Sequence, residues 1–166
     1  MEKIGNVCID DSFYGGEDPE VFRQEDEELL ALMEEFPDDE WETLPLHHPS
    51  YRCLYHFSHL RPNLVDWLPI GKEDHVLEVG CSGGALTGAL AEKAGHVTAA
   101  DPSLTACRIN ALRNRERTNL LLVPGNLPQF LDKCEGQFDY IILADGLSEY
   151  APCLPKLFDK LDVDGS

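Results

Sequence analysis

The residues with the clearest chemical pattern lie between 76 and 103, in the stretch VLEVGCSGGALTGALAEKAGHVTAADPS. An apolar run ends in a glycine cluster, Gly80–Gly84, and a second apolar run ends at Asp101. A strand that turns directly into a helix brings backbone N–H groups to one point, and glycine lets a ligand approach them closely. A carboxylate about twenty residues later is placed to accept hydrogen bonds from both hydroxyls of a ribose. The pattern therefore predicts a nucleotide-type site.

The segments after residue 74 alternate between strand-like and helix-like patterns. Apolar runs predict strands at the ranges 75–80, 96–101, 119–124 and 138–145. Helix-like segments follow them at 84–94, 103–115, 128–134 and 152–162. This alternation predicts an α/β fold with a parallel sheet covered by helices on both faces.

The spacing of the glycines distinguishes between several types of nucleotide-binding site. A dinucleotide fingerprint counted from Gly80 needs glycines where Ser82 and Ala85 stand, so that pattern fails at two positions. A P-loop is excluded because no Gly-Lys-Ser/Thr sequence follows. The pattern present is E-x-G-x-x-G-G, starting at Glu78.

This order of features resembles motif I and the following motifs of the class I S-adenosylmethionine-dependent methyltransferases. The resemblance covers residues 47–166. It is closest to a bacterial subgroup that carries a YRxLYHxSxxRxNLVxWLP lead-in and is often associated with glycosyltransferases of surface-polysaccharide synthesis. It implies a Rossmann-like sheet and S-adenosylmethionine as cofactor. Two departures are visible: Ser82 replaces the usual middle glycine, and the family's sheet continues with further strands beyond the last one here, so the last strands are missing and the chain is expected to be C-terminally truncated.

The resemblance also implies roles for individual residues. The loop backbone would approach the methionine part of the cofactor, and Glu78 would orient the turn or meet the cofactor amino group through water. Asp101 with the adjoining Pro102 would hold the ribose, and Asn126 with Leu127 would border the adenine. Asp145 would face the methionine end or the acceptor. Three residues of the lead-in would cover the cofactor: Tyr51, Arg52 and Tyr55. The loop residues concerned are Gly80, Cys81, Ser82, Gly83 and Gly84.

Several of these residues have plain structural alternatives. Asp101 could cap the helix that begins near Leu104, and Asn126 could be a turn residue. Tyr51 and Tyr55 could pack in a core. Glu149 and Tyr150 are expected at the surface. No residue is required as a catalytic base, and the only candidates are His56 and Asp145.

The charge is unevenly distributed along the chain. Residues 1–45 hold 16 acidic and 2 basic side chains, out of a formal net charge of −18 for the whole chain. Such a chain is not expected to bind nucleic acid through its phosphates. We divide the chain into an acidic N-terminal arm (1–45), a helical lead-in (46–74) and a cofactor-binding domain (75–166). Within the arm, residues 1–20 are expected to be irregular, 19–36 helical and 37–46 a loop.

Other features of the sequence indicate the expected location, metal content and partners of the protein. No apolar run is long enough to span a membrane, and the N-terminus has no signal-peptide pattern, so a cytoplasmic location is expected. The six cysteines are scattered and show no metal-site spacing, so no metal is expected. With the last strands missing, the fourth predicted strand would form an exposed edge, which a partner domain or an oligomer could cover.

The sequence thus favours a methyltransferase acting on a small-molecule or saccharide acceptor, or the cofactor-binding half of one. The alternative is a non-catalytic methyltransferase-like interaction domain. A nicotinamide oxidoreductase is a weaker third hypothesis, because the glycine register is wrong for it.

Overall fold

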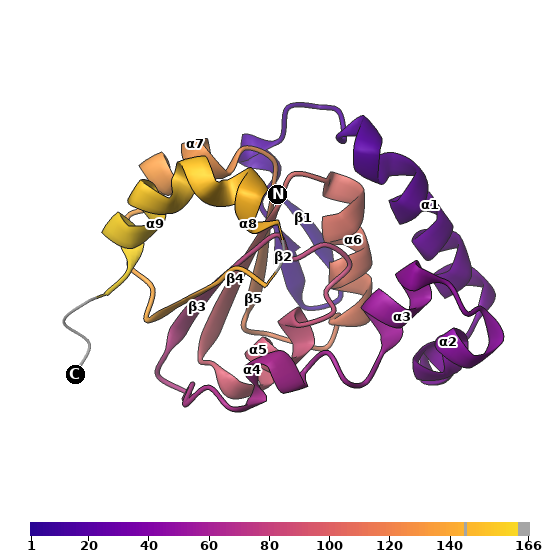
Figure 1. Ribbon diagram of the computed structural model, residues 1–166. Helices are drawn as coiled ribbons and strands as arrows, with labels where there is room; N and C mark the ends of the chain where they lie inside the picture. Colours follow the sequence, from indigo (N-terminus) through magenta and orange to yellow (C-terminus); the bar gives the residue numbers. More distant parts are fainter. Residues whose placement is uncertain (145, 163–166) are drawn as a thin grey trace.

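The computed structural model describes residues 1–144 and 146–162, without the side chains of Val21, Phe22 and Arg52. Its centre is a six-stranded sheet within these residues, in the order β1-β2-β5-β4-β3-β6 (Figure 1). The central strands are β3 (His75–Val79), β4 (His96–Asp101) and β5 (Leu120–Pro124), all parallel. β6 (Tyr140–Ile142) pairs in parallel with the other side of β3. The predicted α/β fold with a Rossmann-like parallel sheet is confirmed.

Strand order reverses at β3, because β4 and β5 lie on one side of it and β6 on the other. In open α/β sheets, ligands bind outside the carboxyl ends of the strands at this reversal point. The fold therefore places the glycine loop, which follows β3, at the usual ligand-binding edge.

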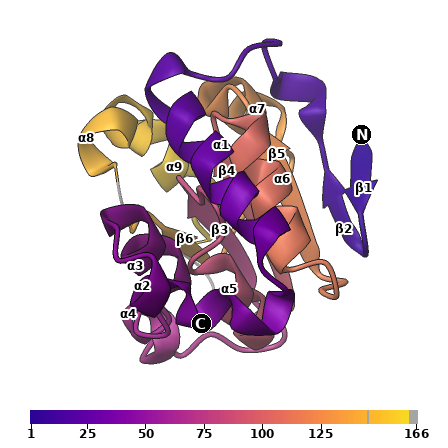
Figure 2. The same ribbon diagram turned by 90° about the vertical axis from the view of Figure 1, so that its right-hand side faces the viewer.

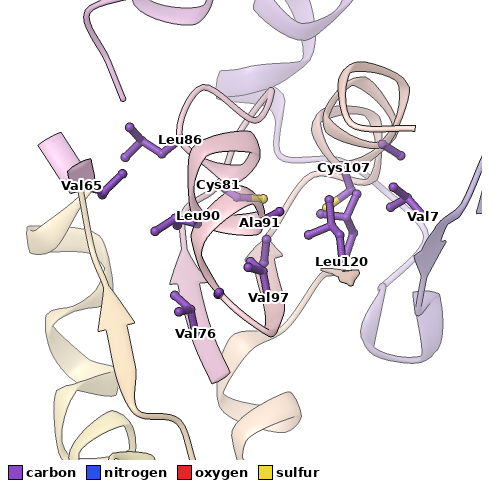
Figure 3. Close-up of a cluster of buried hydrophobic side chains, with 14 of the residues drawn as sticks. Val7, Val65, Val76, Cys81, Leu86, Leu90, Ala91, Val97, Cys107 and Leu120 are labelled. Carbon is purple, nitrogen blue, oxygen red and sulfur yellow. The ribbon is translucent and has the colours of Figure 1, made fainter. Parts of the chain in front are cut away.

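The two faces of the sheet are covered by different helices. One face packs against α5 (Thr87–Lys93) and α6 (Leu104–Arg113), and the side chains of Val76, Val97 and Leu90 meet there (Figure 3). The other face packs against α7 (Leu127–Lys133) and α9 (Leu154–Lys160). The central strands are apolar on both faces because both faces are buried, as expected for a parallel sheet.

An outer layer lies against α6. The long helix α1 (Glu20–Glu35) runs alongside it (Figure 2) and buries Leu29 and Met33 against Ile109 of α6. Helices α2 (Leu44–His47), α3 (Tyr51–Phe57) and α4 (Asn63–Asp66) form the lead-in. Ser50 accepts a hydrogen bond from the Cys53 N–H at 3.1 Å and so caps α3. The helix predicted at 19–36 is confirmed by α1.

The predicted irregularity of residues 1–20 is wrong. β1 (Glu2–Ile4) and β2 (Val7–Ile9) form an antiparallel hairpin around Gly5 and Asn6, and β2 adds in parallel to β5. Gly5 has φ of 58°, the left-handed conformation that a two-residue hairpin turn needs. Val7 and Ile9 are fully buried in the sheet core.

The predicted loop at 37–46 is also wrong. A 3₁₀ helix (η2, Asp38–Thr43) leads into α2, and the indole of Trp41 is buried against the α1–α3 layer. A second 3₁₀ helix (η1, Asp11–Phe13) follows the hairpin, and a third (η3, Ala151–Cys153) joins α8 (Leu147–Tyr150) to α9. No helix among the described residues is long and apolar enough to cross a membrane.

Candidate active site

The loop after β3 is held in an unusual backbone conformation. Gly80, Ser82 and Gly84 all have positive φ, of 75°, 45° and 80°. The N–H groups of Gly80 and Cys81 both donate to the Ala100 carbonyl of β4, at 2.9 and 3.2 Å. Helix α5 begins only at Thr87, later than predicted, because these left-handed residues postpone the first regular turn. Ser82 has a positive φ, in the left-handed region that glycine adopts without strain and other residues rarely adopt.

The loop glycines have two different roles. Gly80 lines the cleft, and a Cβ added there would lie 3.0 Å from Cε2 of Tyr150. A Cβ on Gly84 would lie 2.5 Å from Oδ1 of Asn110, and one on Gly83 would lie 2.9 Å from Cδ2 of Leu29. Gly83 and Gly84 therefore let the loop pack against helices α6 and α1, and the structure does not place them at the cleft as the resemblance implied.

Asp101 lies at the carboxyl end of β4 and braces the loop. One carboxylate oxygen accepts from the Ser82 N–H at 2.7 Å, and the other accepts from the Ser103 N–H at 2.9 Å. Burial raises the pKa of Asp101 to about 7, although the two backbone N–H groups act in the opposite direction. The cap of α6 is Ser103, whose hydroxyl accepts from the Ala106 N–H, so the alternative reading of Asp101 as the helix cap is wrong.

Glu78 is buried below the loop and belongs to a chain of side-chain hydrogen bonds. The Thr87 hydroxyl donates to Glu78 at 2.6 Å, the Asn110 amide donates to Thr87 at 2.8 Å, and Asn114 donates to Asn110 at 2.9 Å. Burial raises the pKa of Glu78 to about 8. The network ties β3 to α5 and α6, and Glu78 lines neither hollow.

Two adjoining hollows lie at the carboxyl edge of the sheet, with volumes of about 220 and 260 Å³. Joined, they fall within the roughly 300–1,000 Å³ typical of small-molecule sites. The first lies between Gly80 and the α3 tyrosines, and the second lies over the end of β5 beside Asn126 and Leu127. Four residues line both hollows: Asp101, Pro102, Glu149 and Tyr150. Asp101 thus lies where the two hollows meet, and the two together are called the cleft below.

Helix α3 covers the first hollow. Tyr51 and Tyr55 both line it, and their ring centroids are 5.9 Å apart. Tyr51 is 78% exposed, so the alternative reading of this tyrosine as a core residue is wrong. The guanidinium of Arg61 lies 4.0 Å from the centroid of the Tyr55 ring.

Helix α8 contributes the residues that the sequence did not indicate. Glu149 and Tyr150 line both hollows, and burial raises the pKa of the Tyr150 phenol well above its ordinary value. Their expected position at the surface is wrong for Tyr150, which is half-buried, whereas Glu149 is exposed within the cleft. The available signal was a Gly-containing turn directly after a predicted strand end, followed by an acid and an aromatic residue.

The remaining predicted residues fall into two groups. Asn126 lies at the edge of the second hollow and also caps α7, because its side chain accepts from the Gln129 N–H at 2.9 Å. His56 is 1% exposed and lies behind Gly83, outside both hollows, so the structure does not support it as a base at the cleft. Asp145 and the side chain of Arg52 lie outside the described residues. Among those that are described, no three His, Cys, Asp or Glu side chains are grouped to hold a metal ion.

Comparison with known proteins assigns this arrangement to a family. The methyltransferase domain family matches residues 76–162, more than half of the chain. The chain belongs to this methyltransferase family. A search of curated protein sequences finds no matching relative.

Solved structures share the fold of this methyltransferase domain. Precorrin 8W decarboxylase of Methanobacterium thermoautotrophicum is 25% identical, with a TM-score of 0.56 over 62% of this chain and 56% of that one. An rRNA methylase from Streptococcus thermophilus is 18% identical (TM-score 0.50, 57% and 58% covered). Magnesium protoporphyrin IX methyltransferase of Synechocystis, solved with S-adenosylhomocysteine, is 21% identical (TM-score 0.50, 61% and 50% covered). The matches span between half and three fifths of these structures, and the three proteins act on different substrates by name, so the fold does not identify an acceptor.

S-adenosylmethionine is the cofactor of this methyltransferase family, and the cleft fits it. The Gly80 backbone is open to the first hollow, where a side chain would fill the space next to Tyr150. Asp101 presents a carboxylate at the junction of the hollows, as a ribose requires. The second hollow is bordered mainly by apolar groups from Val79, Leu127 and Pro128, which suits a flat adenine ring.

Proposed function

We propose that the chain transfers a methyl group from S-adenosylmethionine to a small-molecule or saccharide acceptor, and that the cleft described above is its active site. The observation that carries this proposal is the position of Asp101, which lines both hollows and is hydrogen-bonded to the glycine loop. A single carboxylate thereby links the loop after β3 to the end of β4. The resemblance to glycosyltransferase-associated bacterial enzymes supports a saccharide acceptor.

The proposed roles follow from position. Asp101 accepts hydrogen bonds from the ribose hydroxyls, the Gly80 backbone contacts the methionine portion, and Asn126 and Leu127 border the adenine. Tyr51 and Tyr55 cover the first hollow and exclude water from it. When bound, S-adenosylmethionine supplies a methyl group on a positively charged sulfur, which a nucleophile can attack directly.

Alignment is the main work of such a site, because a direct displacement needs the nucleophile, methyl carbon and leaving sulfur in line. The braced loop serves this purpose: Ser82, Asp101 and Ser103 are joined by two hydrogen bonds and cannot move independently. A base is required only for an acceptor that must lose a proton.

Calorimetric titration with S-adenosylhomocysteine tests the proposal. We expect saturable binding with one site per chain, weakened about 10- to 100-fold in Asp101→Ala, as the loss of a hydrogen bond to a charged group implies. Asp159→Ala, which removes an exposed charge on α9, is the matched control and should bind like the wild type. Absence of binding by the folded wild-type chain would contradict the proposal and favour a non-catalytic interaction domain.

A further inference from the structure

An arginine outside the cleft holds the glycine loop. Arg113 of α6 donates from Nη1 to the carbonyl of Gly83 at 2.9 Å, and it lines neither hollow. Burial lowers the pKa of Arg113 to about 10, so its guanidinium still carries a positive charge at neutral pH. A hydrogen bond from a charged donor is roughly twice as strong as one between neutral groups. The loop is therefore anchored strongly at Gly83.

The hydrogen bonds of Arg113 and Asp101 flank a strained residue of the loop. The Ser82 N–H donates to the Asp101 carboxylate of β4 at 2.7 Å, and the Gly83 carbonyl accepts from Arg113. Between these two bonds the backbone of Ser82 has φ of 45°, in the left-handed region. Such a conformation persists only where the surrounding structure holds it. The loop is thus held on both sides of Ser82, from β4 and from α6.

The packing around Gly83 places this residue but does not orient its carbonyl. A Cβ on Gly83 would lie 2.9 Å from Cδ2 of Leu29 and 3.2 Å from Cγ2 of Ile109, so apolar side chains of α1 and α6 lie against it. Apolar contacts exclude water but have no preferred direction. A hydrogen bond is directional, because it weakens steeply as its angle departs from linear. Arg113 therefore sets the orientation of the Gly83 carbonyl.

Arg113 also contacts the helix that covers the first hollow. Its Cζ lies 5.2 Å from the centroid of the Phe57 ring of α3, and Phe57 is buried. A guanidinium over an aromatic ring is attracted to it. The same helix carries Tyr51 and Tyr55, which line the first hollow. One side chain thus contacts both the glycine loop and the helix that faces it across the hollow.

We propose that Arg113 is a positioning residue of the methyltransferase site. By orienting the Gly83 carbonyl, it fixes Ser82 and thereby the Asp101 carboxylate and the Gly80 backbone, which bind the cofactor. The inference rests on the proposed function, since it adds a residue that supports the same site. Arg113 lies outside the hollows and acts through the loop, so its loss should weaken cofactor binding without removing any contact to the cofactor.

Two substitutions of Arg113 test this inference. In calorimetric titration with S-adenosylhomocysteine, Arg113→Gln should bind about 10-fold more weakly than the wild type, because the charged donor to Gly83 is lost. Arg113→Lys keeps a charged donor but loses the planar group that lies over Phe57. We expect it to recover most of the affinity, to about 3-fold weaker than the wild type.

Two control variants separate positioning from general stability. Arg108→Gln removes the other arginine of α6 that forms side-chain hydrogen bonds, whose Nη2 donates to Glu2 of β1 at 2.9 Å. Val7→Ala removes buried methyl groups from β2, outside both hollows, and lowers stability by a cavity. Both variants should bind S-adenosylhomocysteine like the wild type. Urea unfolding of all variants shows whether affinity follows stability.

Amide hydrogen exchange of Ser82, followed by NMR without ligand, reports the loop directly. Exchange at this amide should be about 10-fold faster in Arg113→Gln and within about twofold of the wild type in Arg108→Gln. Wild-type affinity of a folded Arg113→Gln, or an equal loss of affinity in Val7→Ala, would overturn the positioning inference alone. If Arg113→Gln does not fold, wild-type affinity together with wild-type Ser82 exchange in Arg113→Lys would overturn it.

The wild-type chain keeps the two proposals distinguishable. Failure of the folded wild type to bind S-adenosylhomocysteine would overturn the proposed function, and the role of Arg113 with it. Binding by the wild type that is insensitive to Arg113 would leave the proposed function intact.

Discussion

The floor and the cover of the cleft are built in different ways. The floor consists of the ends of β3, β4 and β5, and its central acid, Asp101, is buried and holds two backbone N–H groups. The cover consists of α3 and α8, helices of 7 and 4 residues, which leave Tyr51 78% and Leu147 59% exposed. Backbone hydrogen bonds to Asp101 fix the floor, whereas the cover exposes large side chains to solvent, although α3 also buries Cys53 and Phe57 against α1.

This difference suggests that the floor binds the cofactor and that the cover contacts the acceptor. A floor of fixed geometry suits the cofactor, because the same molecule is bound in every turnover. An exposed cover of short helices suits contact with the acceptor, which differs from one methyltransferase to another. Substitutions in the floor should therefore alter folding and cofactor binding together. Substitutions in the cover should alter acceptor recognition more than stability.

The largest effect expected is the dependence of stability on pH, which measures how strongly burial in the floor raises the pKa of Asp101. Between the ordinary aspartate pKa of 3.8 and about 7, the folded chain keeps a proton on Asp101 that the unfolded chain has lost. The folded state binds more protons in this window, so the free energy of unfolding falls as pH rises through it. A shift of this size corresponds to at most roughly 4 kcal/mol, to be measured by urea unfolding across that range.

Part of the slope must belong to Asp101 for the comparison to hold. Asp101→Asn should make the fall between pH 4 and 7 clearly less steep than in the wild type but should not abolish it, because burial also raises the pKa of Glu78 to about 8 and Glu78 contributes over the same range. An unchanged slope in this variant would assign the effect to Glu78 and to the general excess of negative charge.

Gly84→Ala tests the packing of the floor. The added Cβ would lie 2.5 Å from Asn110 Oδ1 at a residue with φ of 80°, so both overpacking and backbone strain oppose it. We expect a loss of about 2–4 kcal/mol in the free energy of unfolding, measured by urea denaturation. Gly136→Ala, where nothing lies within 4 Å, should change it by less than about 0.5 kcal/mol. Equal effects of the two substitutions would show that the loop does not pack as described.

Asp18→Ala tests whether the acidic N-terminal segment is part of the floor. Its carboxylate accepts from the N–H groups of Leu104 and Thr105, at 2.7 and 3.1 Å, and so adds to the Ser103 cap of α6 from 86 residues away in the sequence. Removing it should cost about 1–2 kcal/mol in thermal or urea unfolding, as for other helix caps. Glu17→Ala removes an exposed neighbouring acid and should have almost no effect. If both variants were neutral, the segment would not be anchored there.

Ser82→Gly should have the smallest effect. Ser82 has φ of 45°, a conformation that costs an L-residue roughly 1 kcal/mol and glycine almost nothing. We expect a gain of up to about 1 kcal/mol in stability, with unchanged affinity for S-adenosylhomocysteine in calorimetry. A clear loss of affinity would mean that the serine side chain itself contacts the cofactor.

Features with a local sequence signal could be predicted, whereas features that depend on contacts between distant segments could not. The strands, the glycine turn and Asp101 were predictable because continuous apolar runs and their end residues are local signals. The role of Gly83 and Gly84 was not, since it depends on Leu29 and Asn110 in distant helices. The β1–β2 hairpin was missed although Gly5 and Asn6 stand between apolar residues, because its strands have only three residues each. Tyr150 was missed because only the folding of α8 over Gly80 brings it to the cleft.

The most direct test of the account is a crystal structure of the chain with S-adenosylhomocysteine. The account predicts the ribose on Asp101, the adenine beside Asn126 and Leu127, and the methionine portion over Gly80 beneath the tyrosines. A ligand bound elsewhere, or with its ribose away from Asp101, would contradict the assignment of this cleft.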